Sequence, residues 1–483
     1  MRSLIGFVLF NGLALTLGLS TLVAVGLARR RLADLVAAAP AALLCGLALI
    51  GLGALLALIT GLGLDLAVLT AVVLSATAVL TLVGWRRTAR ERFLPAERRL
   101  PPALMWAPPA VVVAFIVVQI LSSRHVPIAW DAAHIWSLKA LALTSHGTLE
   151  GQLFTGAAAF PAAHLDYPLL QPVLGALAFR FAAAGQQGVL LGELWLILGA
   201  TVLAVPWLTA AGRWTWLALA PMVLAMTSGP AAGLLRGDAD VAMACWLAVG
   251  CVALIRALES RRPAYAVLAA LWLGAAANTK NEGMAFAFAV IVVVGVAALW
   301  PPRRSLAPVG VAVAGGALLV APWRLWVAAH GPFVSDVAPL SDSLDLGYLA
   351  DRLPQLDQGA QALLGHFAEG PYYWLVPAVA AVAVAAIASR RSAGLAAIYL
   401  AAVLASVLAV LWVYWISQQP DVAGHIIRTS IRTVTGPLFL AAAALAHLLP
   451  RLLDGVALLG PVDPRGAEVG GSEAQRSEPA LSR

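Results

Sequence analysis

Long apolar runs, separated by short polar stretches, form the main pattern along this chain. Most of them are long enough to cross the hydrocarbon core of a bilayer, for which a helix needs about 20 apolar residues. Backbone groups in lipid must be hydrogen-bonded within their own segment, so such runs favour helices over open strands. The pattern therefore predicts an all-α polytopic membrane protein with about thirteen transmembrane helices. The expected spans are residues 4–27, 37–60, 64–85, 103–121, 187–210, 214–230, 239–258, 263–279, 284–300, 306–328, 371–389, 394–416 and 431–449.

The composition agrees with this pattern. Of the 483 residues, 61% are hydrophobic and 11% are charged, whereas an ordinary soluble domain has about 25% charged residues. The formal net charge of +7 comes from arginines in short clusters between apolar runs, so it indicates membrane topology and not a nucleic-acid partner. The three cysteines lie inside apolar runs, and their spacing indicates neither a disulfide framework nor a zinc site.

Arginine clusters assign the two sides of the membrane, because cytoplasmic loops carry an excess of basic residues. We expect Arg29–Arg31, the stretch around Arg90 and the C-terminal tail to be cytoplasmic. The loops that contain Asp131 and Lys280 then lie on the outer side.

Three parts of the chain differ in character. Residues 1–102 are expected to form an N-terminal unit of three spans with a cytoplasmic, arginine-rich linker. Residues 103–450 form the main transmembrane unit, whose large outer loops are 122–186 and 329–370. Residues 451–483 have no apolar period and predict a disordered cytoplasmic tail.

Two outer segments are expected to contain helices that do not cross the membrane. The apolar stretch 167–183 is short and contains Pro172 and Arg180, so we interpret it as a juxtamembrane or re-entrant helix packed against protein. The acidic loop 329–370 is expected to form short helices over the outer face.

Candidate chemistry begins in the first large outer loop. Trp130 and Trp136 suit a helix at the membrane interface. If this segment is helical, Asp131, His134 and Ile135 share one face, and Lys139 lies two turns further along. The alternative is an interfacial turn in which Asp131 caps a helix N-terminus.

Further carboxylates lie at the starts of later segments. Asp166 either caps the following helix or is a second catalytic carboxylate. Asp238 and Asp240 begin a span, where one aspartate would suit the helix dipole but two are not needed. Their Asp-x-Asp spacing is a weak metal motif, and the sequence contains no supported metal or cofactor site.

Lysine is rare in this chain. Of its 31 basic residues, 29 are arginine, and only Lys139 and Lys280 are lysine. These two positions are therefore candidates for sites that need a compact ammonium group and not a planar guanidinium, with chance retention as the alternative. Lys280 and Glu282 lie in a polar hexapeptide that connects two spans.

A basic stripe precedes the last span. His425, Arg428 and Arg432 are spaced i, i+3 and i+7, which stacks them along one helical face where a phosphate would bind. The alternative is a set of arginines that extend to the membrane interface. With Asp131 as a base and Lys280, Arg432 and His425 stabilising a departing phosphate, the residues fit group transfer from a lipid-phosphate donor.

At these positions the chain resembles the bacterial membrane glycosyltransferases of the GT-C superfamily, which includes the aminoarabinose lipid A transferases and the protein O-mannosyltransferases. The resemblance covers about residues 103–450, with the first three spans as an added unit. The motifs that carry it are, in order, Trp130-Asp131-Ala132-x-x-Ile135-Trp136-x-Leu138-Lys139, His164-x-Asp166-Tyr167-Pro168-Leu169-Leu170, Asp240-Val241, Thr279-Lys280-Asn281-Glu282-Gly283 and Pro420-Asp421-x3-His425-x4-Ser430-x-Arg432.

The resemblance implies a GT-C-like helical bundle in a bacterial inner membrane. It also implies an inverting transfer from a polyprenyl-phosphate sugar to an extracytoplasmic acceptor, with Asp131 as the catalytic carboxylate. Many relatives have paired acidic residues at that point, but Asp131 is followed by Ala132. A second carboxylate would then come from Asp166 or Asp238, and Trp130, His134 and Lys139 are expected to line the substrate site.

Two other functions stay open at this point. A transporter or lipid flippase would usually place ionisable groups near the bilayer midplane and often has repeated halves. Here the polar groups lie at span ends, and no repeat is visible. A non-catalytic subunit for assembly of an envelope polymer is the second alternative.

Overall fold

The structure is a computed structural model, and most of the residues that it describes are helical. Among them there is no strand, and the β-bridge that is present pairs Val337 with Ser417. The prediction of an all-helical chain is therefore confirmed for this part of the protein. The described residues are 2–88, 102–155, 160, 163–183, 186–227, 235–299, 305–331, 337–369, 374–388, 392–419 and 421–457.

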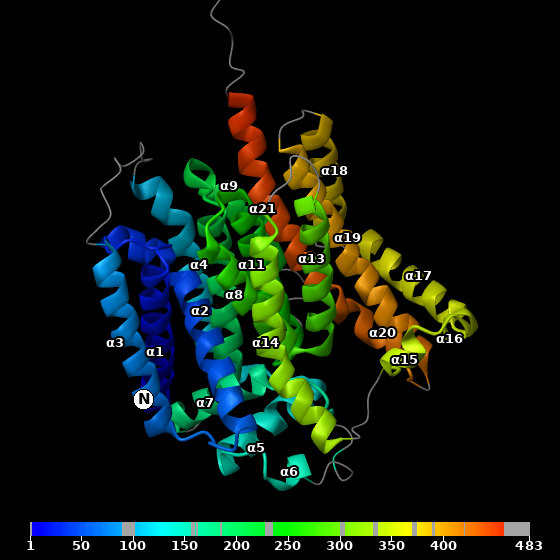
Figure 1. The fold of residues 1–483 in the computed structure, drawn as a ribbon, viewed down its shortest axis with the longest axis horizontal. Helices are drawn as coiled ribbons and strands as arrows, with labels where there is room; N and C mark the ends of the chain where they lie inside the picture. Colours follow the sequence, from blue (N-terminus) through cyan, green and yellow to red (C-terminus); the bar gives the residue numbers. More distant parts are fainter. Residues whose placement is uncertain are drawn as a thin grey trace, which may run out of the picture.

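Within these residues, nine helices are long and apolar enough to cross a membrane. They stand side by side in a bundle (Figure 1), as expected of a multi-pass membrane protein. They are α1 (Arg2–Ala24), α2 (Leu32–Ile59), α3 (Leu66–Thr88), α8 (Gln186–Leu208), α11 (Ala239–Ser260), α13 (Asn281–Leu299), α14 (Ala307–His330), α19 (Ala393–Trp415) and α21 (Thr435–Ala457). The other expected spans also contain helices: α4 (Pro102–Ser122), α9 (Thr215–Met226), α12 (Pro263–Thr279) and α18 (Leu375–Ala388).

Helix α11 lies at the centre of the bundle. It contacts α8, α12, α13 and α21, and nearly all of its side chains are buried. Its sequence is apolar all around the helix from Val241 to Ile255, which is the pattern of a helix enclosed by others. Trp246 of α11 and Trp272 of α12 are among the largest fully buried side chains. The packing of α11 fixes where its first residues, Asp238 and Asp240, are held.

The N-terminal helices pack tightly on each other and on the main bundle. A Cβ on Gly18 would lie 1.8 Å from the Ala42 carbonyl oxygen, and one on Gly46 would lie 1.8 Å from that of Ala14. Small residues allow this close approach of α1 and α2. Helix α2 also contacts α8, and both α1 and α2 contact α7 (Leu170–Ala182). The three-span unit expected over 1–102 therefore shares one hydrophobic core with the rest.

Short helices cover one end of the bundle, which we call the site end. They are α5 (Leu138–His146), α6 (Gln152–Thr155) and α7, and all lie low in Figure 1. Helix α7 has 13 residues, nearly all buried, and is too short to cross a bilayer. Its Arg180 donates to the carbonyls of Leu64, Leu143 and Thr144, which satisfies backbone acceptors at the ends of neighbouring segments.

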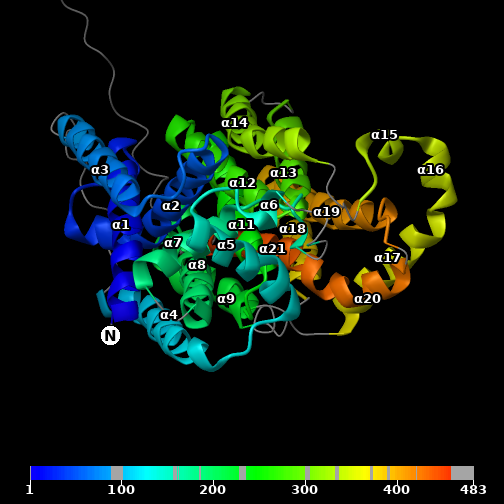
Figure 2. The ribbon, with the colours of Figure 1, turned by 90° about the horizontal axis from the view of Figure 1, so that it is seen from below.

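A lobe projects sideways near the same end (Figures 1 and 2). It consists of α15 (Leu340–Ser343), α16 (Leu346–Asp351), α17 (Leu353–Glu369) and α20 (Val422–Thr433). Arg352 donates to the Ser417 carbonyl and joins the acidic loop to the segment before α20. Helix α20 leads directly into α21, so the lobe is anchored to the bundle next to the site end.

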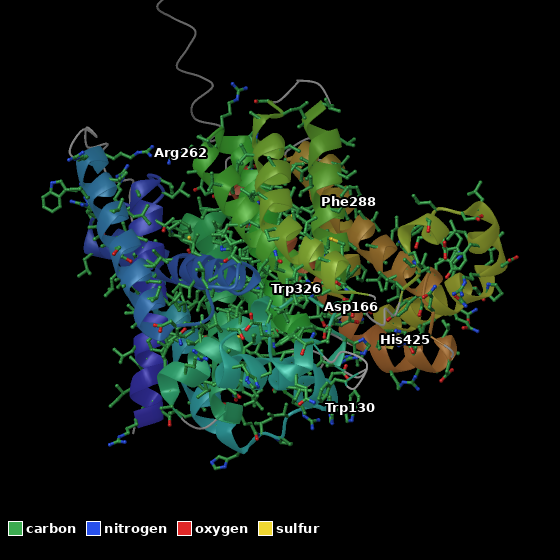
Figure 3. The ribbon with its side chains drawn as sticks, turned by 60° about the horizontal axis from the view of Figure 1, so that its bottom comes forward. Trp130, Asp166, Arg262, Phe288, Trp326 and His425 are labelled. Atoms are coloured by element: carbon green, nitrogen blue, oxygen red, sulfur yellow. The ribbon has the colours of Figure 1, made fainter. Side chains whose placement is uncertain are left out.

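The two ends of the bundle differ in their polar residues, as Figure 3 shows. Arg262 lies at one end, and Asp166 and Trp130 lie at the other. The expected sidedness assigns the end with Asp166 and Trp130 to the outside, and this assignment stays a prediction. Helix α21 continues to Ala457, so the first residues of the expected tail 451–483 are helical. Residues 458–483 and Arg90 lie outside the described residues.

Candidate functional site

A π-helix changes the expected geometry of the segment around Asp131. Residues 132–137 form this π-helix, which continues into α5. A π-helix has wider turns than an α-helix, and here Ile135 is buried while His134 is exposed. The predicted common face of Asp131, His134 and Ile135 is therefore wrong. His134 instead donates from Nδ1 to the Trp130 carbonyl at 2.8 Å and stacks on the Trp130 ring at 4.3 Å.

Asp131 is paired with the arginine that ends α20. Arg432 Nη1 donates to Asp131 Oδ2, and the same nitrogen lies 3.9 Å from Asp238 Oδ1. Neither aspartate accepts a hydrogen bond from the helix that it precedes, so the helix-cap interpretation fails for both. Side chains from the segment before α5, the start of α11 and the end of α20 thus meet at one point.

Lys280 lies between two carboxylates next to this point. Its Nζ is 2.8 Å from Asp240 Oδ1 and 3.0 Å from Glu282 Oε1. Burial by itself would lower the pKa of Lys280, but Asp240 and Glu282 outweigh it and hold the pKa above its ordinary value. The side chain is therefore a buried ammonium ion that is compensated on two sides.

The chain holds Lys280 there by a sharp break between α12 and α13. Lys280 is extended, with φ −153° and ψ 154°, while its neighbours on both sides are helical. A Cβ on Gly283 would lie 2.1 Å from the Ala276 carbonyl oxygen, so only glycine permits this approach of the two helices. We call Asp131, Asp238, Asp240, Lys280, Glu282 and Arg432 the acidic cluster.

Asp238 has the most unusual carboxyl group in the acidic cluster. Its side chain is 4% exposed, and its Oδ1 has no hydrogen-bond partner among the described residues. Burial raises the pKa of Asp238 to about 7, with a further contribution from Asp240 that Arg432 opposes. A carboxyl group that titrates near neutral pH is typical of groups that accept or release protons in catalysis.

A second group of polar side chains lies beside the acidic cluster. Asn281 Nδ2 donates to Asp166 Oδ2 at 3.0 Å, and Arg324 Nη2 donates to Asn281 Oδ1 at 2.7 Å. Asp166 also attracts Lys139 and Arg324 electrostatically. Asp166 does not cap α7, because the residue before that helix is Leu169. We call Lys139, Asp166, Asn281 and Arg324 the basic cluster.

Lys139 is fully buried in the basic cluster. Its Nζ donates to the His164 carbonyl at 2.6 Å and lies 5.5 Å and 5.8 Å from the ring centres of Trp136 and Tyr167. Burial lowers the pKa of Lys139 to about 7, although Asp166 opposes the shift. Lys139 thus differs from Lys280, and the two lysines of this chain lie in adjacent but different environments.

The two clusters share their supporting residues. Asn281 follows Lys280 directly in the sequence, and Ala239, between the two aspartates of α11, packs with Ile135 and Trp136. Tyr167 packs against this small hydrophobic group and stacks on Trp136 at 5.7 Å. A substrate group at one cluster would therefore lie close to the other.

Of the basic residues expected to line one face of α20, not all reach the site. Arg432 enters the acidic cluster, but Arg428 is 66% exposed and pairs with Asp421 at 3.6 Å. His425 lies against Tyr414, with 6.2 Å between the ring centres. The structure thus does not bring Arg428 to the other candidate residues.

Asn281 and Arg324 were not among the residues expected to form the site. Arg324 carries a signal that sequence reasoning can use, because an arginine inside an otherwise apolar span is costly unless it has a function or a partner. Asn281 has no such signal. Its role follows from its position between Asp166 and Arg324.

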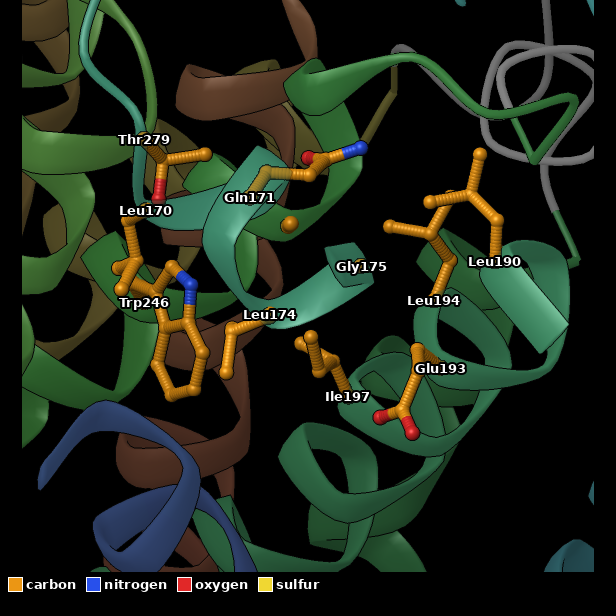
Figure 4. Close-up of a pocket in the computed structure, with 11 residues that line it drawn as sticks. Leu170, Gln171, Leu174, Gly175, Leu190, Glu193, Leu194, Ile197, Trp246 and Thr279 are labelled. Atoms are coloured by element: carbon orange, nitrogen blue, oxygen red, sulfur yellow. The ribbon is translucent and has the colours of Figure 1, made fainter. Parts of the chain in front are cut away.

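Thr279, the residue before Lys280, lines a small cavity next to these clusters. This cavity, of about 10 Å³, lies between α7, α8 and α11 (Figure 4). Gln171, Glu193, Trp246 and Thr279 line it, together with apolar side chains, and it has room for about one water molecule. Among the described residues, no three His, Cys, Asp or Glu side chains are grouped as metal ligands would be.

Functional assignment depends on these two clusters and their surroundings. Comparison of the chain with protein-family models, with curated proteins and with solved structures found no match.

Proposed function

We propose that this protein is a membrane glycosyltransferase of GT-C-like fold. It transfers a sugar from a polyprenyl-phosphate donor to an acceptor on the outer side of a bacterial inner membrane, with about thirteen spans and inversion at the anomeric carbon. The observation that carries the proposal is the meeting of Asp131, Asp238 and Arg432 at one end of the bundle. This end is the one that the arginine distribution assigns to the outside.

Asp131 is the proposed base. Its side chain is 25% exposed, whereas that of Asp238 is 4% exposed, so Asp131 is the carboxylate that an acceptor reaches. The acceptor oxygen attacks the anomeric carbon, the bond to the phosphate oxygen breaks, and that oxygen keeps the electron pair. The acceptor proton passes to Asp131. Arg432 holds Asp131 Oδ2 and so orients the carboxylate for this step.

Asp238 supplies the second carboxylate. The sequence offered Asp166 and Asp238 for that role, and Asp238 is the one that contacts the same guanidinium as Asp131. With a pKa of about 7, Asp238 can accept or release a proton within the acidic cluster at neutral pH. Asp166 has a different place, beside Asn281 in the basic cluster.

The test is Asp131→Asn in protein reconstituted with a polyprenyl-phosphate sugar. Loss of a general base typically lowers the rate by about a hundredfold to ten-thousandfold, so we expect transfer to fall in that range while folding is retained. Asp65→Asn is the matched control, because Asp65 caps α3 at the site end and asparagine caps helices equally well. Near-normal turnover by a folded Asp131→Asn protein would remove Asp131 from the mechanism.

A transporter or lipid flippase is the second candidate, and one observation favours it. Glu193 lies inside α8, is buried, and accepts a hydrogen bond from Asn11 of α1 at 2.7 Å. Ionisable residues within spans are typical of transport pathways. Lipid translocation in proteoliposomes that Glu193→Gln abolishes and Asp131→Asn spares would favour this function over transfer.

A further inference from the structure

The acidic cluster is poorly suited to bind an anion. It contains four carboxyl groups and two cationic side chains, and carboxylates contact both cations directly. An approaching phosphate would meet these carboxylates at short range, where like charges repel strongly because the site is buried. Lys280 and Arg432, which the sequence suggested as phosphate ligands, are already occupied.

The basic cluster has the opposite balance. Its one carboxylate, Asp166, attracts the permanently charged Arg324 and Lys139, which is partly protonated at neutral pH because its pKa is about 7. Arg324 is bonded to a neutral partner, the Asn281 side-chain oxygen. A negatively charged group added here would be attracted to the cations without first displacing a salt bridge to either of them.

Arg324 also has unused hydrogen-bonding capacity. A guanidinium has five N–H donors in a planar fork that matches phosphate oxygens. The Nε of Arg324 is buried and has no hydrogen-bond partner among the described residues. A buried donor without an acceptor is unfavourable because it has lost its hydrogen bonds to water, and a bound phosphate oxygen would supply the missing acceptor.

We propose that Arg324 is the phosphate-binding residue of this site, with Asn281 as the residue that positions it. The chemistry recognised is a phosphate ester or phosphate ion next to the acidic cluster. The identity of the ligand as the lipid-linked donor rests on the proposed function, whereas binding of a phosphate group does not. The acid–base residues then lie in the acidic cluster and the residue that binds the phosphate lies in the neighbouring basic cluster. This arrangement separates the base from the leaving group.

Binding is measured with purified full-length protein in nanodiscs. The probes are a polyprenyl monophosphate, the corresponding polyprenol without phosphate, and inorganic phosphate. We expect Arg324→Gln to weaken binding of the polyprenyl monophosphate by at least about tenfold, because a charge-assisted bidentate contact is lost, and to leave binding of the polyprenol unchanged. Arg262→Gln, an exposed arginine at the opposite end of the bundle, is expected to match the wild type.

Arg324→Lys tests the geometry with charge retained. We expect the affinity of this variant to lie between those of the wild type and Arg324→Gln, because lysine cannot provide the planar fork. This variant also provides the test if Arg324→Gln does not fold. Saturable binding of inorganic phosphate that depends on Arg324 identifies the phosphate group alone as the ligand. If the polyprenyl monophosphate binds and inorganic phosphate does not, the ligand is a lipid head group. Both results support the proposal.

Three results would overturn it: wild-type affinity in a folded Arg324→Gln protein, equal affinity of the wild type for polyprenyl monophosphate and polyprenol, or no binding of either phosphate probe.

The transferase proposal fails separately. If phosphate binding depends on Arg324 but the wild type transfers no sugar, the phosphate site stands and the transferase does not. If transfer occurs and Arg324→Gln leaves its rate and donor KM unchanged, the transferase stands and this inference does not.

Discussion

Asp238 shows how burial beside other charges changes a single carboxyl group. Its place at the start of α11 suggests a helix cap, but its side chain makes no capping bond. The surrounding side chains bury it and place it near Arg432, Asp240 and Asp131. The resulting pKa of about 7 makes its protonation depend on pH in the neutral range.

This shift predicts a pH dependence of stability. The pKa of Asp238 is raised from 3.8 to about 7 in the folded protein. The folded state therefore binds a proton that the unfolded chain has already released, so the contribution of Asp238 to stability is present at low pH and is lost as the pH rises toward 7. We expect the unfolding temperature of the wild type to fall more steeply between about pH 4 and pH 7 than that of Asp238→Asn. Parallel curves for the two proteins in detergent would contradict this.

Lys280 provides a second prediction at the same scale. Its ammonium group fits between Asp240 and Glu282, at 2.8 Å and 3.0 Å, and the larger planar guanidinium of Lys280→Arg does not fit the same space. We expect transfer activity to fall at least about tenfold although the charge is retained. Lys280→Ala should be worse, because it leaves buried carboxylates unpaired.

The matched control for Lys280 is Arg262→Lys, an exchange between the same two residue types at an exposed position. Activity should be measured together with the unfolding temperature, so that loss of folding is recognised. Equal activity of Lys280→Arg and the wild type would mean that lysine was retained there by chance.

At the scale of helices, the contact between α1 and α2 depends on two glycines. Gly46 of α2 faces the Ala14 carbonyl, where a Cβ would lie 1.8 Å from the oxygen. Gly46→Ala should therefore separate the helices and destabilise the protein. Gly53, also inside α2, has nothing within 4 Å of its Cβ position, so Gly53→Ala should be neutral or stabilising by up to about 1 kcal/mol. The measurement is the unfolding temperature of the two variants. Equal changes in Gly46→Ala and Gly53→Ala would argue against the close contact.

The π-helix at 132–137 is the element that sequence reasoning described least well. The expected α-helical spacing placed His134 beside Asp131, but the wider turn leaves His134 exposed on Trp130. A single π-turn has no reliable sequence pattern, because it depends on how the surrounding helices constrain the segment. In contrast, the break at Lys280 was predictable from its polar hexapeptide and Gly283.

At the scale of the whole molecule, the separation of the two ends predicts the labelling pattern of introduced cysteines. Leu62 is 79% exposed in the loop between α2 and α3, and this loop contacts α5 through the bond from Leu64 to Gly147. Leu62→Cys should react with a membrane-impermeant reagent added outside intact cells, and Arg262→Cys should not. The native cysteines are fully buried, so background labelling should be low.

The experiment needs a control in permeabilised cells, where both positions should react. Labelling of position 262 but not of position 62 in intact cells would reverse the sidedness. The acidic cluster would then face the cytoplasm, and the proposed outer-face transfer from a lipid-phosphate donor would fail.

Local patterns along the chain are enough to predict that it is helical, where most helices lie, and that polar residues gather at span ends. These features depend on local order, since the length and period of an apolar run favour a helix whatever the partner. These patterns also identified all six residues now found in the acidic cluster, because charged residues beside apolar spans are few in this chain.

Packing between distant helices sets which of these residues meet. Arg432 pairs with Asp131 across 301 positions of sequence, while Arg428, four residues earlier on the same helix, pairs at the surface with Asp421. The division into an acidic and a basic cluster, and the place of Arg324 in the second, depend on how α11, α13, α14 and α20 pack. Side-chain partners are set by distances between helices, and a linear pattern of residue types does not contain those distances.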